Sequence, residues 1–187
     1  MVIIEEILGY FLIGFILIAV LSVFYIPFYF LLRKKIPLIR QIVYFLFGAC
    51  VFIILSATVF IGINIVPAGR RTLNIIPFRV FTESWEMGFI KKISQTFANI
   101  VMFMPLGFIF PVAFKKARKL YTTTIYMALF SFLIEFVQYF IGRSSDIDDF
   151  MLNTLGGISG YFIFFILSRV FENKSFWKKL TGTIKQV

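Results

Sequence analysis

Positions 7–32 of the chain read ILGYFLIGFILIAVLSVFYIPFYFLL, a continuous apolar run in which no side chain carries a charge. About 20 apolar residues in an α-helix span the hydrocarbon core of a bilayer, so this run is long enough to cross it with some tilt. It is unlike a cleaved signal peptide, because Glu5 and Glu6 precede it in place of basic residues and no small-residue cleavage site ends it. The run therefore predicts a transmembrane helix.

Four further apolar runs follow the first one, at residues 42–66, 97–114, 120–141 and 150–168. Hydrophobic residues make up 60% of the 187-residue chain, whereas a soluble domain contains about 45–50%. A core of this size cannot hide so much apolar surface, so a bilayer must cover the remainder. The sequence predicts an all-α fold, a polytopic transmembrane bundle of about five helices that forms a single domain over residues 1–187.

Basic side chains are divided unequally between the two sides of this bundle. The loop after the first helix, the loop after the third and the C-terminal tail carry thirteen lysines and arginines, against six on the other side. Cytoplasmic segments carry the excess of basic residues, so we expect the N-terminus outside and the C-terminus inside. With apolar runs of this length, the net charge of +10 indicates basic loops and anionic lipids, and we expect no nucleic-acid partner.

The residue types that are missing exclude several classes of enzyme. The chain has no histidine, and Cys50 is its single cysteine. An intramolecular disulfide, serine–histidine or cysteine–histidine catalysis by the chain's own groups, and histidine-ligated metals are therefore excluded.

Almost every unusual polar residue falls on the side of the bundle that we predict to be extracytoplasmic. The opposite helix ends carry little beyond solvated lysines. This placement predicts a polar cluster at the outer membrane face, and as its ligand-binding candidates we take Arg70, Arg71, Asn74, Asn99, Glu135, Gln138, Arg143, Asp146, Asp149 and Asn153.

Glu135 is the strongest signal in this set. An ionised acid near the centre of a membrane helix costs ~2.5–3.5 kcal/mol on insertion scales. Ser131, Glu135 and Gln138 share one face of the fourth predicted helix. Glu135 could be structural, paired with Arg143 or bonded to Asn99. We favour a ligand-facing or proton-carrying role, because acids inside membranes mark functional sites.

Three aspartates precede the fifth predicted helix. Asp146, Asp148 and Asp149 could bind a hard cation such as magnesium through oxygen ligands. We favour a solvated capping turn, in which Asp149 satisfies free N–H groups at the start of the helix. Further along, Gly156 and Gly160 form a G-x-x-x-G pattern that allows close helix packing and leaves a homo-oligomer open.

Three segments carry a recognisable set of motifs, namely residues 71–78 (RTLNIIPF), 99–108 (NIVMFMPLGF) and 131–160 (SFLIEFVQYFIGRSSDIDDFMLNTLGGISG). In this order and approximate spacing they resemble the VanZ-like family of bacterial membrane proteins, named for an accessory teicoplanin-resistance protein. The positions that match the family pattern are Asn74, Pro77, Phe78, Asn99, Phe103, Pro105, Gly107, Glu135, Gln138, Arg143, Asp146, Asp149, Asn153, Gly156, Gly157 and Gly160.

The resemblance implies a multi-pass protein of the bacterial cell membrane that contributes to antibiotic resistance. We expect it to support tolerance of glycopeptides, teicoplanin especially, through the outer polar cluster and without a cofactor. Its expected partners are the lipid bilayer and either a glycopeptide or the lipid-linked cell-wall precursor that such drugs target. Arginine suits phosphate and carboxylate groups, so Arg70 and Arg71 would contact them.

Two other functions are open. In the first, the protein is a membrane enzyme acting on a lipid-linked phosphate or envelope precursor. Its aspartates would hold a divalent cation, and the catalytic candidates would be Glu135, Asp148 and Asp149. In the second, a small transporter would cycle protons on Glu135, although no inverted repeat supports it. We favour the non-enzymatic envelope protein.

Overall fold

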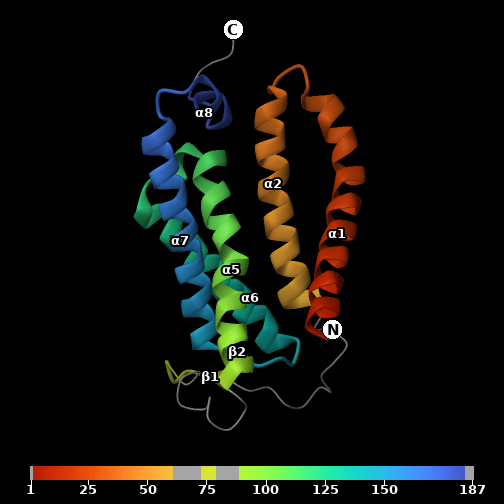
Figure 1. The fold of residues 1–187 in the computed structure, drawn as a ribbon, viewed down its shortest axis with the longest axis vertical. Coiled ribbons are helices and arrows are strands. Elements are labelled where there is room, and N and C mark those ends of the chain that lie inside the picture. Colours follow the sequence, from red (N-terminus) through yellow and green to blue (C-terminus); the bar gives the residue numbers. More distant parts are fainter. Residues whose placement is uncertain (1, 61–72, 79–88, 184–187) are drawn as a thin grey trace.

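The computed structural model describes residues 2–60, 73–78 and 89–183. Its long helices alternate in direction along the long axis of the molecule (Figure 1). They are α1 (Val2–Leu32), α2 (Leu38–Leu55), α5 (Phe89–Ala113), α6 (Leu120–Phe140) and α7 (Ile147–Phe171).

Four of the described helices contain stretches long and apolar enough to cross a membrane. These stretches are Leu38–Val59, Thr96–Ala113, Leu120–Phe140 and Ile147–Phe171, and α1 adds a shorter apolar stretch at Ile16–Leu32. The predicted all-α polytopic bundle is confirmed. The helix α5 begins before its predicted run and α7 extends beyond its run at both ends, because polar residues there continue the helix, whereas α6 ends one residue before its run does. The end of the second predicted run, residues 61–66, lies outside the described residues.

The centre of the bundle is a close crossing of α5 over α7, made by glycines. A Cβ atom added at Gly107 would lie 2.0 Å from the carbonyl oxygen of Gly157, and one at Gly160 would lie 2.0 Å from that of Met104. A Cβ at Gly156 would lie 2.3 Å from the carbonyl oxygen of Ile100. The two backbones therefore touch, and the interpretation of the glycine pattern as a packing surface is confirmed.

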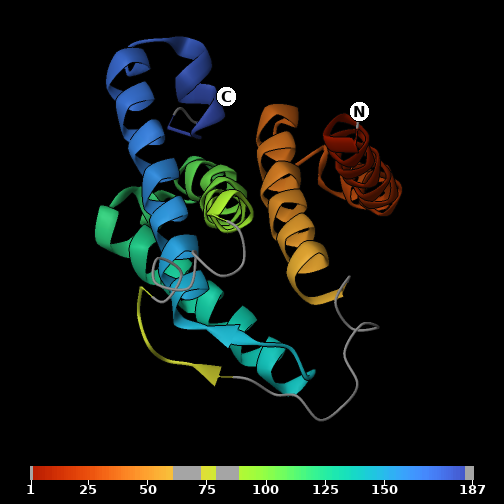
Figure 2. The ribbon, with the colours of Figure 1, turned by 60° about the horizontal axis from the view of Figure 1, so that its bottom comes forward.

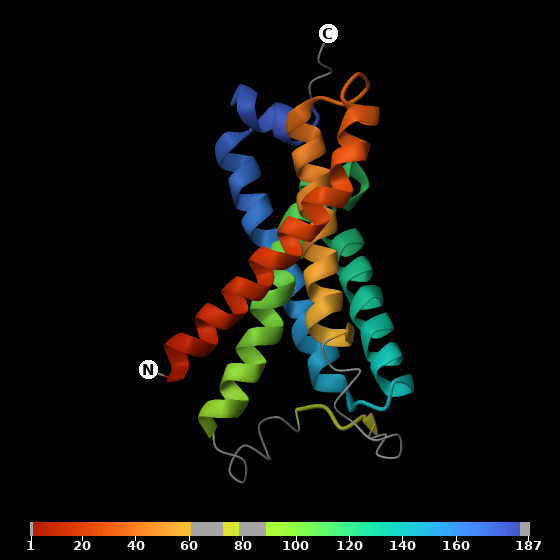
Figure 3. The ribbon, with the colours of Figure 1, turned by 90° about the vertical axis from the view of Figure 1, so that its right-hand side faces the viewer.

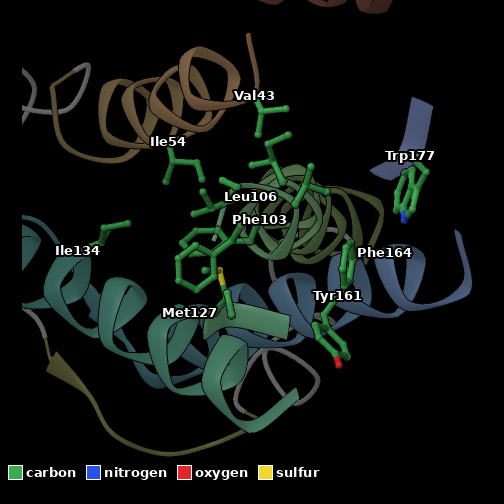
Figure 4. Packing of buried hydrophobic residues seen from close by; sticks show 14 residues of the cluster. Val43, Ile54, Phe103, Leu106, Met127, Ile134, Tyr161, Phe164 and Trp177 are labelled. Atoms are coloured by element: carbon green, nitrogen blue, oxygen red, sulfur yellow. The ribbon is translucent and has the colours of Figure 1, made fainter. Parts of the chain in front are cut away.

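Apolar side chains fill the space around this crossing. Phe103 and Leu106 of α5 lie at the centre, and Phe103 is fully buried (Figure 4). Val43 and Ile54 of α2 cover them from one side, and Met127 of α6 lies on the other (Figure 4). These side chains hold α2, α5, α6 and α7 together as the framework of the site.

At the C-terminal end of the bundle, a short helix folds back over the long ones. This helix, α8 (Ser175–Leu180), follows α7 and was missed in the sequence, where the tail carried no apolar run. Arg40 of α2 donates hydrogen bonds to the carbonyl oxygens of Val112 (2.8 Å), Ala113 (2.6 Å) and Leu180 (2.7 Å). The basic residues of this end are therefore not only solvated charges, because Arg40 joins α2, α5 and α8.

The opposite end is closed by short segments. There, the helix α2 continues as a π-helical turn, η1 (Ser56–Phe60). A 3-10 turn, η2 (Lys115–Arg118), links α5 to α6 at the end that carries α8. The two-residue strands β1 (Leu73–Asn74) and β2 (Ser145–Asp146) pair in parallel, with Asn74 opposite Asp146. Figure 2 shows this pair beside the end of α6, where β2 leads into α7.

Candidate functional site

Glu135 sits near the end of α6 and anchors the connection between α6 and α7. Its side chain is only 6% exposed, and its Oε2 accepts the backbone N–H of Asp146 at 2.8 Å. Neither structural partner predicted for it is correct, because Arg143 and Asn99 donate to other groups. Both partners of the Glu135 carboxylate belong to β2, namely the backbone N–H of Asp146 and the side chain of Ser145, and they hold the acid at a fixed position.

Asp146 joins three elements through one carboxylate oxygen. Its Oδ1 accepts the backbone N–H of Asp148 at 2.9 Å, which makes Asp146 the N-cap of α7. The same oxygen accepts Asn74 Nδ2 from β1, also at 2.9 Å. The sequence-based assignment of the cap to Asp149 was wrong, because α7 begins at Ile147 and Asp149 lies inside its first turn.

The other two aspartates bind different parts of the chain. Asp148 is buried, and its Oδ1 accepts the backbone N–H of Phe78 at 2.6 Å. Asp149 accepts Asn99 Nδ2 of α5 at 2.6 Å. The three carboxylates thus hold β1, the turn at Phe78 and α5 around the start of α7. Among the described residues, no group of three or more acidic, histidine or cysteine side chains could hold a metal ion.

Phe78 has an unusual backbone conformation at this junction. Its φ of 65° lies in the left-handed region, which costs a bulky residue about 1–2 kcal/mol. The backbone N–H of Phe78 donates to Asp148, and this hydrogen bond helps to fix the left-handed conformation. Strain of this kind persists only where surrounding contacts fix it, and it is enriched at functional sites.

Deeper in the bundle, Asn153 of α7 faces Ser131 of α6. Both side chains are almost fully buried, and Asn153 Nδ2 donates to Ser131 Oγ at 3.1 Å. Within the described part of the chain, Asn153 Oδ1 has no hydrogen-bond partner. A buried acceptor without a partner costs about 1–3 kcal/mol. The Oδ1 atom of Asn153 is therefore free to accept a hydrogen bond from a ligand or a water molecule.

Gln138 and Arg143 belong to a second group, turned toward α2. Gln138 Nε2 and Arg143 Nη1 both donate to the carbonyl oxygen of Thr58, at 3.0 and 2.5 Å. Thr58 lies in η1, and carbonyls at helix ends lack partners within the helix. Of the ten predicted ligand residues, Gln138 and Arg143 form this clamp, while Arg70 and Arg71 lie outside the described residues. The other six lie around the start of α7 and, together with Asp148, are called the acid–amide network: Asn74, Asn99, Glu135, Asp146, Asp149 and Asn153.

An apolar cavity of about 380 Å³ opens beside the acid–amide network. Glu135, Asn74 and Asp146 are among its lining residues, although almost all of its lining surface is apolar. Its apolar wall includes Phe132, Phe136 and Phe140, whose four-residue spacing places them on one face of α6. More than half of each of these three side chains is exposed, so the cavity opens toward the side of the bundle that faces lipid.

The family model VanZ/LLP1 matches residues 41–168 of the chain. The chain belongs to the VanZ/LLP1 family. The match runs from the first turn of α2 almost to the end of α7, so it includes the whole acid–amide network, and it confirms the resemblance seen in the three motifs. No curated protein and no solved structure matches the chain.

Several contacts of this VanZ-like site could not be found from residue types. Thr58 accepts through its backbone carbonyl, and Glu135 binds a backbone N–H, so neither contact depends on the identity of the partner's side chain. The wall of Phe132, Phe136 and Phe140 was visible as an i, i+4 series. In a membrane helix such a series is equally typical of lipid-facing bulk, so spacing alone could not assign it to a cavity.

The VanZ-like site combines two surfaces with different chemistry. Carboxylate and amide groups are fixed by hydrogen bonds between residues of β1, β2, α5, α6 and α7, while the adjoining cavity offers aromatic and aliphatic side chains. An arrangement of this kind can bind an amphipathic molecule, with its polar part at the network and its apolar part in the cavity.

Proposed function

We propose that this VanZ-like membrane protein acts in the bacterial cell envelope and contributes to tolerance of glycopeptides, teicoplanin in particular. The observation that carries the proposal is the position of Glu135. This buried acid lies in the wall of an apolar cavity, next to Asn74 and Asp146. A carboxylate at the edge of an apolar space is suited to recognising a polar group on an otherwise apolar ligand.

The ligand class follows from the same geometry. Lipid-linked cell-wall precursors join a long apolar chain to a polar headgroup, and the glycopeptides bind that headgroup. The half-exposed Phe132, Phe136 and Phe140 would contact the chain from the lipid side. The acid–amide network would meet the headgroup or the bound drug.

The proposed side of the membrane rests on the distribution of charge. The loop between α1 and α2, the η2 turn and α8 are rich in lysine and arginine and lie at the end opposite β1 and β2 (Figure 1). By the positive-inside tendency, that basic end would face the cytoplasm and the acid–amide network would face outward. An outward-facing network is where a drug acting on the cell wall would encounter the protein.

The test compares the wild-type chain with Glu135→Gln in a glycopeptide-susceptible Gram-positive host. Growth inhibition by teicoplanin and by vancomycin would be measured at matched membrane levels of the two proteins. Glutamine retains a carbonyl oxygen that can accept the N–H of Asp146, so the variant removes the charge and spares the fold. Glu172→Gln is the matched control, because Glu172 is an exposed acid at the opposite end.

We expect wild type and Glu172→Gln to raise teicoplanin tolerance and Glu135→Gln to lose that effect. Equal protection by all three proteins would make Glu135 a structural residue and the proposed site wrong. If none of them protects, the chain shares the fold of its family and does not contribute to teicoplanin tolerance. The membrane enzyme acting on a lipid-linked phosphate would then become the leading alternative.

A further inference from the structure

The end of the bundle opposite the acid–amide network concentrates positive charge. Twelve of the chain's basic side chains lie there, whereas Glu172 is the single acid of this end in the described part of the chain (Figures 1 and 3). The basic residues are Arg33, Lys34, Lys35, Arg40, Lys115, Lys116, Arg118, Lys119, Arg169, Lys174, Lys178 and Lys179.

A cavity of about 330 Å³ lies within this basic end, between the last turns of α7 and the short helix α8. Three cations line it, each from a different element, namely Arg118 of η2, Arg169 of α7 and Lys178 of α8. One acid, Glu172 at the end of α7, lines it as well, so the cations outnumber the acid and the net charge of the lining is positive. Phe164 and Trp177 form an aromatic part of the wall, with ring centroids 6.2 Å apart. The cavity therefore combines converging positive charge with an aromatic surface.

The cations of this cavity retain unused donors. Arg118 donates to the carbonyl oxygens of Pro111 (3.3 Å) and Thr181 (2.5 Å), which uses two of its five N–H groups. Burial lowers the pKa of Arg118, and the nearby Arg40 lowers it further. Because both guanidinium groups donate only to neutral oxygens among the described residues, their charge favours an anion nearby.

The other two cations are free of carboxylate partners in the described part of the chain. Arg169 lies over the ring of Phe165, 5.3 Å from its centroid, and Lys178 has no side-chain hydrogen bond. Ser168, which also lines the cavity, has a hydroxyl oxygen that is shielded from solvent and lacks a partner among the described residues. Two cations are thus available to one ligand, and rotation of the Ser168 side chain to another rotamer would add its hydroxyl.

The surface next to the cavity is apolar. On α7, the side chains of Phe162, Ile166 and Val170 are 49%, 58% and 64% exposed. They lie within the stretch of α7 that is apolar enough to cross a membrane, so acyl chains would cover them. A ligand held at the cavity would have its charged part beside the cations and its apolar part along α7.

We propose that this cavity binds the phosphate-bearing headgroup of an anionic phospholipid. Arg169, Lys178 and the unused donors of Arg118 contact the phosphate, and Ser168 adds a hydroxyl donor. Basic pockets between membrane helices are known binding places for anionic headgroups, and aromatic side chains such as Trp177 favour the same interfacial depth. The exposed face of α7 distinguishes a lipid from free phosphate, because only a lipid supplies the chains that cover it.

The full-length protein offers a direct probe of this cavity. Trp85 and Trp177 are its two tryptophans, so Trp85→Phe leaves Trp177 as the single fluorophore. This protein would be reconstituted in nanodiscs containing brominated phosphatidylglycerol or brominated phosphatidylcholine at equal mole fractions, and quenching of Trp177 measured. We expect a preference for phosphatidylglycerol of at least about fivefold, and its loss in Arg169→Gln/Lys178→Gln, since each interfacial cation contributes about 1 kcal/mol, which is about fivefold.

Two further variants separate the cavity from the general charge of this end. Lys34→Gln/Lys35→Gln removes two exposed cations from the α1–α2 loop, away from the cavity, and should keep the preference. Arg169→Lys/Lys178→Arg keeps both positive charges and should also keep the preference for phosphatidylglycerol. This variant therefore separates the loss of charge from a folding defect caused by substitution at these positions. Circular dichroism would verify helical content in every variant.

Equal quenching by the two lipids would overturn the proposal, as would an equal loss of preference in the loop variant. Inorganic phosphate provides the last arm, added to nanodiscs of phosphatidylcholine alone. If phosphate raises the melting temperature of the protein while phosphatidylglycerol shows no preference, the site takes a small anion and the lipid assignment is wrong.

Discussion

At both ends of the bundle, charged side chains form hydrogen bonds with backbone groups, but the two ends differ in the sign of the charge and in how many side chains are held. At the acid–amide end, Glu135 and Asp148 accept backbone N–H groups. At the basic end, Arg40 and Arg118 donate to backbone carbonyls. Backbone partners do not move independently of the fold, so each of these charges is held by the architecture.

The ends differ in how many of their charges are held in this way. The acids Glu135, Asp146, Asp148 and Asp149 of the acid–amide network each have a hydrogen-bond partner, whereas most lysines of the basic end are exposed. Exposed lysines can orient the chain in a membrane without a defined geometry. Buried acids with fixed partners give shape to a binding site. Exposed lysines are therefore suited to orienting the chain, whereas the fixed acids at one end and the cavity of Arg118, Arg169 and Lys178 at the other offer a defined geometry to a ligand.

The largest effect is expected at Arg40. In Arg40→Met the carbonyl oxygens of Val112, Ala113 and Leu180 lose a charged donor, and α8 loses its anchor. We expect the protein in detergent to lose about 3 kcal/mol of stability, measured by thermal unfolding. Lys34→Met, which removes an exposed charge of the same end, is the control and should unfold like wild type. Similar unfolding of both variants would show that this end is held by packing alone.

A smaller effect is expected at Asp146. Asp146→Ala removes the N-cap of α7 and the bond to Asn74, and should cost about 1–2 kcal/mol. Asp146→Asn keeps one acceptor oxygen and should cost less. Hydrogen–deuterium exchange should speed up at the start of α7 and stay unchanged in α8. Faster exchange at both ends would contradict the view that each end is fixed by its own local contacts.

The smallest effect is expected from magnesium. Each aspartate of the acid–amide end already accepts an N–H group, and Asp148 and Asp149 point to different elements. Adding Mg²⁺ or a chelator should therefore leave the melting temperature unchanged within error. A rise with Mg²⁺ that disappears in Asp148→Asn would reveal a cation site and would favour the enzyme over the envelope-binding role.

Much of this architecture could be predicted from the sequence, and the limits have physical causes. Long uncharged runs indicated the helices, and Gly156 and Gly160 indicated a close crossing, because these features depend on residue type and spacing. The cap was misplaced because Asp146 and Asp149 are equally good capping residues, and only the true start of α7 separates them. Contacts with backbone groups, such as those made by Glu135 and by the Thr58 carbonyl, could not be predicted, because a backbone group is the same in every residue type other than proline.

The position of α1 has a consequence for how such a protein can vary. Figure 3 shows α1 crossing α2 obliquely, with its N-terminal part well away from the other helices. Its described contacts include Tyr25, which donates to the carbonyl oxygen of Gln41, and the family match begins only at residue 41. A helix attached to one side of a framework can be lengthened, exchanged or fused to a reporter without displacing Glu135. The first helix is therefore the natural place for experimenters to add a label.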